Sequence, residues 1–306
     1  MFFVNSQSEK KNNIITTNIE HPSILEVCKM LGGLGAEINY IPVDKEGFVN
    51  PLNIEKSITD KTLLVSIIHG NNEIGSLQDI EKIGKICREK GVYFHIDACQ
   101  SFTKTEIDVK KQNIDLMTLN SHKIHGPKGV GALFIRKGVK IAPLFNGGGH
   151  EKGMRSGTEN VSGIVGFGEA VRLADKEKKG IDKMQRLRDY AIKIMLKIPN
   201  TKLNGPQINK DKRLCNNINL SFKNIEGEAI SQLLEEEGIY VSTGSACASH
   251  SLKRSHVLEA IGLNDLEINS SIRISLSKYT TKKEIDYFIK NLKEIVEKLR
   301  EISPIK

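Results

Sequence analysis

The sequence predicts an α/β protein with a large domain built on a mostly parallel sheet and a small α+β C-terminal domain. Short β-like runs alternate with helical segments through the first half, as in a parallel sheet covered by helices. Leu63–Ile68 is an apolar run of the kind that forms a strand buried on both faces. The second half lacks this alternation and ends in a long amphipathic segment, which indicates a separate, smaller domain.

The strands of the large domain are expected where apolar and β-branched residues cluster between turn signals. They are predicted at Asn13–Thr17, Ile38–Val43, Leu63–Ile68, Val92–Ile96, Leu116–Leu119 and Ala132–Ile135. Helices are predicted between them at Ile24–Leu31, which follows Pro22, at Pro51–Ile58, and over the apolar face formed by Ile80, Ile83, Ile86 and Cys87.

A helical region from about Val161 to Ile198 joins the two domains. Its middle, Asp175–Gly180, is almost entirely charged, so we predict the domains as 1–177 and 178–306. Beyond it we expect a strand at Asn217–Phe222, a helix at Ala229–Glu237 and a strand at Ile272–Leu276. Thr281 and Glu284 have the spacing of a capping box that opens the last helix. The apolar stripe of that helix comprises Ile285, Phe288, Ile289, Leu292, Ile295, Val296 and Leu299.

Composition excludes several classes of protein. The chain has 306 residues, 39% of them apolar and 27% charged, which argues against disordered and fibrous proteins. It has no apolar run long enough for a membrane span and no signal-peptide core. The net charge of +8 is spread along the chain without a basic block, which makes a nucleic-acid partner unlikely. Five cysteines, an odd number without close pairs, predict a reduced, cytoplasmic protein.

Polar residues follow three predicted strands, at the edge where ligands bind in open α/β sheets. Taken singly, such residues are more often caps, turn residues or solvated side chains. Together they place an acid, an amine and an imidazole at one edge. The three groups are Asp97 with Gln100, His122 with Lys123, and Asn71, Asn72 and Glu73.

These residue types suit a carbonyl cofactor. A lysine can form a Schiff base with an aldehyde. A buried aspartate such as Asp97 can keep a pyridine nitrogen protonated, so that the ring withdraws electrons. His21, just after the first large-domain strand, could stack on such a ring, or could instead be an ordinary residue at a helix start.

Two residues of the second half are further candidates. Cys247 lies in Thr243–Ser249, a run of small residues, and is either a mobile nucleophile or an inert thiol in a turn. The other four cysteines are expected to serve packing. Arg273, flanked by isoleucines, requires an anion if it is buried, either a substrate carboxylate or a protein carboxylate.

Two other motifs carry little weight. Gly126–Gly131 is glycine-rich but lacks the strand and helix order of a dinucleotide-binding loop. His122, His125 and Cys99 lack a fourth ligand at structural spacing, so no metal site is predicted.

The motifs resemble those of the class V aminotransferase family of pyridoxal-phosphate (PLP) enzymes, which have fold type I. The similarity rests on His95–Gln100, Ser121–Gly129 and Gly147–Thr158. Within that family, Gly244–Cys247 and Ser270–Leu276 resemble the NifS/IscS-like cysteine desulfurases. The resemblance runs from about Asn13 to the C-terminus.

This resemblance implies a role for each candidate residue. Lys123 would hold PLP and move the substrate α-proton. Asp97 would pair with the pyridine nitrogen, His21 would stack on the ring, and Gln100 and Asn72 would lie at the ring hydroxyl. Phosphate contacts are implied for Ser121, His122 and, from the partner subunit of a homodimer, Thr158.

On the substrate side, the resemblance implies that Arg273, helped by Asn72, binds the carboxylate of L-cysteine. Cys247 would attack the substrate sulfur, keep it as a persulfide and release L-alanine. The sulfur would pass to an iron–sulfur scaffold protein or to tRNA thiolation. Selenocysteine is an alternative substrate.

The sequence departs from the family pattern in two places. Asn120 stands where the family has serine. A phosphate loop at a helix N-terminus, found in the family ahead of the matching region, is not in this sequence, so the large domain is expected to be incomplete at its N-terminus. Two alternatives therefore stay open: an inactive fragment or one half of a split enzyme, and a basic, non-enzymatic protein that binds RNA or an acidic scaffold.

Overall fold

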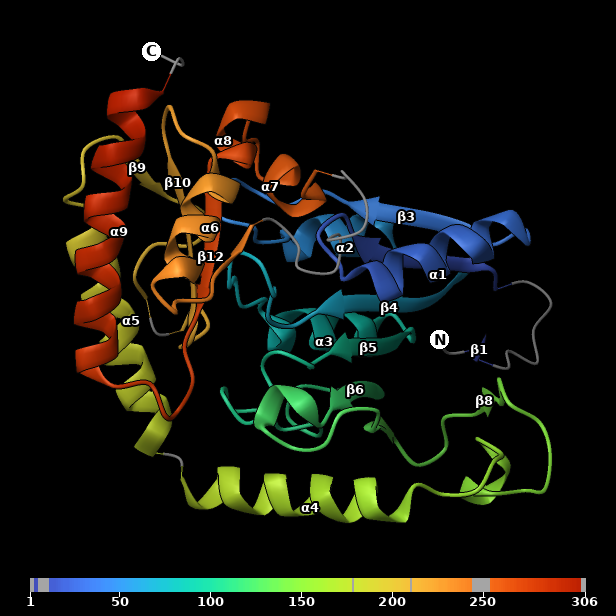
Figure 1. Ribbon diagram of the computed structural model, residues 1–306. Coiled ribbons are helices and arrows are strands. Elements are labelled where there is room, and N and C mark those ends of the chain that lie inside the picture. The colour runs from blue at the N-terminus through green and yellow to red at the C-terminus, as the bar shows by residue number, and fades with distance from the viewer. Residues whose placement is uncertain (1–2, 5–10, 178, 210, 244–253, 304–306) are drawn as a thin grey trace. The chain divides into compact units, whose positions relative to one another are not determined.

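The computed structural model describes residues 3–4, 11–177, 179–209, 211–243 and 254–303 (Figure 1). The chain divides into two compact units, each with a sheet of its own. The first unit consists of Met1–Pro42, Val49–Gly70 and Gln78–Lys176. The second consists of Val43–Phe48, Asn71–Leu77 and Glu177–Lys306, so two short segments of the N-terminal half belong to it.

The first unit is built on a six-stranded sheet with the order β3-β2-β4-β5-β6-β7 (Figure 1). Its strands are β2 (Asn13–Thr17), β3 (Glu37–Ile41), β4 (Thr62–Ile68), β5 (Tyr93–Asp97), β6 (Leu116–Asn120) and β7 (Gly131–Ile135). All neighbouring pairs are parallel except β6 with β7. The predicted mostly parallel sheet is thus confirmed, with every strand within two residues of its expected ends.

The helices of this unit lie between and after these strands, and the first three connect parallel strands. They are α1 (Pro22–Gly33), α2 (Pro51–Ser57), α3 (Ile80–Glu89), the short 3-10 helices η1 (His122–Ile124) and η2 (Glu151–Gly153), and α4 (Val161–Lys176). The unit also has a two-stranded antiparallel sheet of β1 (Phe3–Val4) and β8 (Ile141–Ala142).

Helix α3 shows how the apolar pattern fixes the packing. Asp79 caps its N-terminus by accepting a hydrogen bond from Lys82 N at 3.0 Å. The apolar face predicted from the sequence, from Ile80 to Cys87, is buried. Gly84 lies on the same face, where its backbone closely approaches the chain at Gln112 and the ring of Phe94 on β5.

The second unit has an antiparallel sheet of order β11-β12-β10-β9. Its strands are β9 (Thr201–Leu203), β10 (Asn217–Phe222), β11 (Ser242–Thr243) and β12 (Ser271–Ser275). Its helices are α5 (Lys179–Met195), α6 (Gly227–Glu236), α7 (His256–Ala260), α8 (Asp265–Asn269) and α9 (Lys282–Ile302).

Helix α9 confirms the prediction for the C-terminal segment. Thr281 and Glu284 form the predicted capping box, in which each side chain bonds to the other's backbone. The predicted apolar stripe packs into one cluster with α5, α6 and the sheet. Burial of this stripe stabilises the helix more than its intrinsic propensity does.

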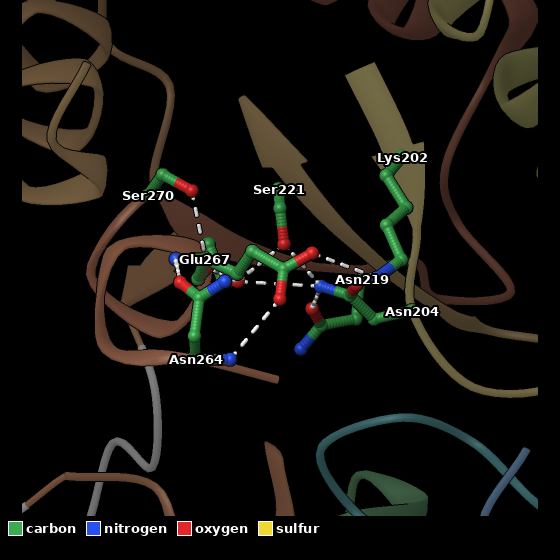
Figure 2. Close-up of polar contacts among 8 residues, drawn as sticks. Lys202, Asn204, Asn219, Ser221, Asn264, Glu267 and Ser270 are labelled. Carbon is green, nitrogen blue, oxygen red and sulfur yellow. Dashed lines mark hydrogen bonds and ion pairs between the residues drawn. The ribbon is translucent and has the colours of Figure 1, made fainter. Parts of the chain in front are cut away.

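A buried polar network crosses the sheet of the second unit (Figure 2). Asn204 Nδ2 donates to Asn219 Oδ1 at 2.8 Å and to Ser221 Oγ at 2.7 Å. At its edge, Lys202 Nζ pairs with Glu267 Oε1 at 2.8 Å, and Glu267 also belongs to the capping box of α8. The network joins the end of β9 to β10 and α8. Its hydrogen bonds offset the cost of burying these amide and hydroxyl groups.

Among the helices that the structure describes, none is both long and apolar enough to cross a bilayer.

Replacing Gly84 with alanine should destabilise the first unit. The added Cβ would lie 1.9 Å from the Gln112 carbonyl oxygen, a backbone atom with little freedom to move. Overpacking of this kind costs about 1–3 kcal/mol, or roughly 2–12 °C in Tm. Scanning calorimetry measures the shift. Gly33→Ala is the matched control, because a Cβ at Gly33 in α1 meets nothing within 4 Å. Equal melting temperatures for Gly84→Ala and the wild type would contradict the packing described.

Candidate active site

Candidate polar residues of the first unit lie at the carboxyl ends of β5 and β6. Register pairs Ile68 with Asp97 and Asp97 with Thr118, so Asp97 ends the middle strand. Its carboxylate is 7% exposed and accepts a hydrogen bond from Cys99 N at 2.9 Å. This acid therefore lies at the edge where the sequence placed it.

Lys123 lies on η1, just after β6. The Asn120 side chain accepts a hydrogen bond from Lys123 N at 3.3 Å. Ile124, next along the chain, is buried against Phe167 and Ala170 of α4. The backbone is thus anchored on one side while the Lys123 side chain stays exposed. Asn120, where the family pattern has serine, supports the backbone of the lysine.

Ser121 provides a buried hydroxyl beside this lysine. The residue is fully buried, and its Oγ has no hydrogen-bond partner among the described residues. A Cβ at residue 126 would lie 2.1 Å from this Oγ, so only glycine leaves room for the hydroxyl. A buried polar group without a partner is costly, and an anionic ligand that accepts its hydrogen bond would remove the cost. The residues present therefore fit a phosphate group.

Lys104 connects the turn after β5 to the lysine segment. Its Nζ donates to Gln100 O at 2.9 Å and to Lys123 O at 3.4 Å. The structure thus brings Gln100 and Lys123 together through a residue that no sequence signal identified. Lysine is common on surfaces, and its two acceptors are backbone atoms far apart in sequence.

His21 caps the N-terminus of α1. Its Nδ1 accepts a hydrogen bond from Ser23 N at 3.2 Å and lies 2.8 Å from Ser23 Oγ. An accepting Nδ1 places the ring proton of neutral His21 on Nε2. The residue thus has the ordinary place at a helix start that the sequence allowed, and contacts with Ser23 orient its ring.

Glu20 is a second buried carboxyl in the first unit, and the sequence did not single it out. Its Oε1 accepts hydrogen bonds from Thr17 Oγ1 at 2.5 Å and from Ile68 N at 2.9 Å. Burial raises its pKa to about 8, and the charge of Asp97 adds to the shift. Glu20 is therefore mostly protonated at neutral pH.

His95 lies two residues before Asp97, on the same face of β5. Its Nδ1 is 2.8 Å from Ser66 Oγ and its Nε2 is 2.8 Å from Thr118 Oγ1. Burial lowers its pKa to about 3, so the ring is neutral. The bonds on both ring nitrogens link β4, β5 and β6 beneath Asp97 and stiffen the strand that carries it.

The remaining predicted phosphate residues are exposed. His122 is exposed on η1, and partial burial together with the charges of Lys123 and Lys128 lowers its pKa. Thr158 is exposed in the segment before α4. Neither is drawn toward Ser121 by a described contact within the first unit.

Asn72 and Arg273 belong to the second unit. Arg273 Nη1 donates to the Asn72 carbonyl oxygen at 3.2 Å, so the structure brings these two residues together. The electrostatic partner of Arg273 is the buried carboxylate of Glu73. A protein carboxyl group thus lies close enough to Arg273 to interact with its charge, and binding of a substrate carboxylate is a separate proposal.

The cysteines differ in reactivity. Burial raises the pKa of Cys28 to about 11 and that of Cys87 to about 12, and it raises that of Cys99 further, with Asp97 adding to the effect and Lys123 opposing it. Cys215 is buried. Thiols with raised pKa values are weak nucleophiles at neutral pH. Cys247 lies outside the described residues.

Comparison with known proteins identifies the class of enzyme. Residues 2–288 match the Aminotransferase class-V family, so the chain belongs to that family. A cysteine desulfurase IscS of Methanosarcina thermophila is 49% identical over 298 residues, covering 97% of this chain and 73% of the relative. Other matches of 46–48% identity are also named cysteine desulfurases. Within its family, the chain is therefore a cysteine desulfurase.

Solved structures agree in fold. A NifS-like protein, 39% identical, superposes with a TM-score of 0.87 over 95% of this chain and 77% of that structure. SspA in complex with cysteine, 35% identical, has a TM-score of 0.74 over 89% of this chain and 76% of that structure. The predicted resemblance and the fold type I class are confirmed.

Glu20 should make stability depend on pH. Its native pKa of about 8 exceeds its usual value of 4.5, so the native state keeps a proton that the unfolded chain loses. Its contribution is complete below pH 4.5 and is lost as pH rises through 8, by up to about 1.4 kcal/mol per pH unit.

The test compares Tm from pH 5 to pH 9 by scanning calorimetry. We expect the Tm of the wild type, relative to that of Glu20→Gln, to fall from pH 5 to pH 8 and then level off. Glu26→Gln, an exposed residue on α1, should run parallel to the wild type. Parallel curves for all three proteins would show that Glu20 is not protonated.

Proposed function

We propose that this chain is a PLP-dependent enzyme that converts L-cysteine to L-alanine and keeps the sulfur as a persulfide on Cys247. The proposal rests on Asp97, Lys123 and the buried Ser121 hydroxyl, which follow the carboxyl ends of neighbouring strands. The chain that carries them is 49% identical to a cysteine desulfurase. PLP, when bound, supplies an aldehyde that joins the substrate nitrogen and a pyridine ring that withdraws electrons from the bonds around Cα.

The residues of the first unit would hold this cofactor. Lys123 would bind its aldehyde carbon, and Asp97, at the end of β5, would face the pyridine nitrogen. His21 would stack on the ring and Gln100 would contact the ring hydroxyl. Phosphate contacts are proposed for Ser121, His122 and the partner subunit's Thr158.

Each group has a defined part in the reaction. Arg273 would bind the substrate carboxylate, as a guanidinium pairs well with that group, and Asn72 would assist it. Once released from the cofactor, the amine of Lys123 would move the proton at the substrate Cα. Cys247 would attack the substrate sulfur, so that the C–S bond breaks, an S–S bond forms and carbon gains a proton to give L-alanine.

Reactivity of the thiols supports Cys247 as the nucleophile. Three of the four described cysteines have pKa values raised by burial, and the fourth is buried. The sulfur would pass from Cys247 to an iron–sulfur scaffold protein, with tRNA thiolation as a second outlet. A persulfide carrier needs reducing surroundings, so we propose a cytoplasmic location.

We further propose a homodimer. Apolar side chains near Thr158 are exposed on the first unit, among them Phe145 at 55%, Val161 at 64% and Val165 at 66%. Exposed apolar residues that lie together mark interaction sites. A second copy that covered them would also bring Thr158 toward the neighbouring phosphate.

Lys123 should be required for cofactor binding. Titration of the purified chain with PLP should produce a visible absorbance band in the wild type and none in Lys123→Ala. Lys128→Ala removes an exposed lysine five positions away and should keep the band. A folded wild-type chain without a band would refute PLP binding and favour the inactive-fragment alternative.

Cys247 should carry the sulfur. After one turnover with L-cysteine, mass spectrometry should find an added sulfur on Cys247 in the wild type. Cys247→Ser should lose both this mass and at least about 100-fold in alanine formation, because a hydroxyl is a far poorer sulfur acceptor. Cys99→Ser, which removes a thiol of raised pKa, should retain the label. A persulfide that forms in Cys247→Ser would rule out the assigned nucleophile.

A further inference from the structure

Glu73 is a buried carboxylate of the second unit with no role in the reaction so far. It is 1% exposed. The backbone N–H of Glu73 donates a hydrogen bond to Asn71 Oδ1 at 2.8 Å. Its carbonyl oxygen accepts from Asn217 Nδ2 at 3.1 Å and from Asn219 Nδ2 at 3.2 Å. Asn217 and Asn219 thus hold the Glu73 carbonyl group against β10, and Asn71 holds the Glu73 N–H.

The Glu73 side chain reaches the start of α7. Ser255 Oγ donates to Glu73 Oε2 at 2.5 Å, and the same Oγ accepts from Leu258 N at 3.1 Å as the N-cap of the helix. Ser255 is 3% exposed and follows Cys247 by eight residues in the sequence. The carboxylate therefore fixes the residue at which the chain leaves the Cys247 segment and begins a helix.

Glu73 also faces a cation. Arg273 binds the carbonyl oxygen of Asn72, the residue before Glu73, and its charge favours the ionised carboxylate. His256 acts in the same direction, while burial disfavours ionisation and raises the Glu73 pKa overall. One carboxyl group thus contacts the helix cap through a hydrogen bond and interacts with the charge of Arg273, which is bonded to the preceding residue.

We propose that Glu73 is a positioning residue that ties Arg273, the proposed binder of the substrate carboxylate, to Ser255 and so to the segment that carries Cys247. The inference rests on the proposed function. Burying a carboxyl group is costly, and here the same group bonds to the N-cap of α7 and interacts with the charge of Arg273. Charge on Glu73 orients Arg273 and so sets the KM for L-cysteine, whereas its bond to Ser255 sets the rate of sulfur transfer.

Two variants separate these effects. Glu73→Gln keeps an acceptor for Ser255 but removes the charge beside Arg273, so KM for L-cysteine should rise about tenfold while persulfide formation at saturating cysteine stays within about threefold. Ser255→Ala keeps the charge and removes the bond, so KM should stay within about twofold while persulfide formation slows about tenfold. Glu236→Gln, an exposed glutamate on α6, is the control and should leave both unchanged.

A second readout needs no turnover. Amide hydrogen exchange of α7 in the chain without cofactor should accelerate in Ser255→Ala and in Glu73→Ala, since both lose the bond that holds the cap, but not in Glu73→Gln or Glu236→Gln.

The outcomes distinguish the inference from the function beneath it. Wild-type protein that forms no persulfide refutes the proposed function, and the exchange data still test the Glu73–Ser255 link. If the wild type is active, the inference is overturned by KM and rate changes that are equal in the two variants. It is also overturned if amide exchange of α7 is unchanged in Glu73→Ala. A KM change confined to Glu73→Gln together with a rate change confined to Ser255→Ala supports it.

Discussion

The parallel register of β4, β5 and β6 is the constraint on which the first unit depends. Parallel strands bring their carboxyl ends to one edge, and the pairs Ile68–Asp97 and Asp97–Thr118 set Asp97 between its neighbours at that edge. The neutral His95 reinforces the register by bonding to Ser66 and Thr118 on both sides. A slip of one residue would turn Asp97 to the opposite face of the sheet. The acid, the lysine segment and the buried hydroxyl all follow from this pairing.

The electrostatics at this edge depend on which carboxyl holds a proton. Glu20 and Asp97 are close enough for their charges to interact, and Glu20 is the more deeply buried. Burial is the main reason that the Glu20 pKa is raised, and the charge of Asp97 adds a smaller effect. The hydrogen bonds to Glu20 from Thr17 and Ile68 orient its carboxyl without ionising it. Glu20 therefore adds little negative charge to this edge at neutral pH.

Sequence patterns predicted the six strands of the mostly parallel sheet, α3 and the capping box of α9, because each has a local apolar or capping signal. They also located Asp97 and Lys123, which directly follow such strands. Glu20, Lys104 and Glu73 were not assigned roles, because their partners lie far away in the sequence or are backbone atoms. Helices α7 and α8 have only five residues each, too few for a periodic pattern. Nor does periodicity reveal that Asn71–Leu77 contributes to the second unit, since its contacts are side-chain amides from β10.

The raised pKa values of the described thiols affect which cysteines can accept transferred sulfur. Sulfane sulfur migrates between thiols by exchange, and each additional thiolate is a site at which it can be lost or over-reduced to sulfide. Cys28 and Cys87 are buried and Cys99 is partly buried, and all three thiols stay protonated at neutral pH, so they compete poorly for the transferred sulfur. The raised pKa values of these cysteines thus disfavour sulfur transfer to the wrong thiol. They also protect the three thiols from electrophiles, which react with exposed thiolates.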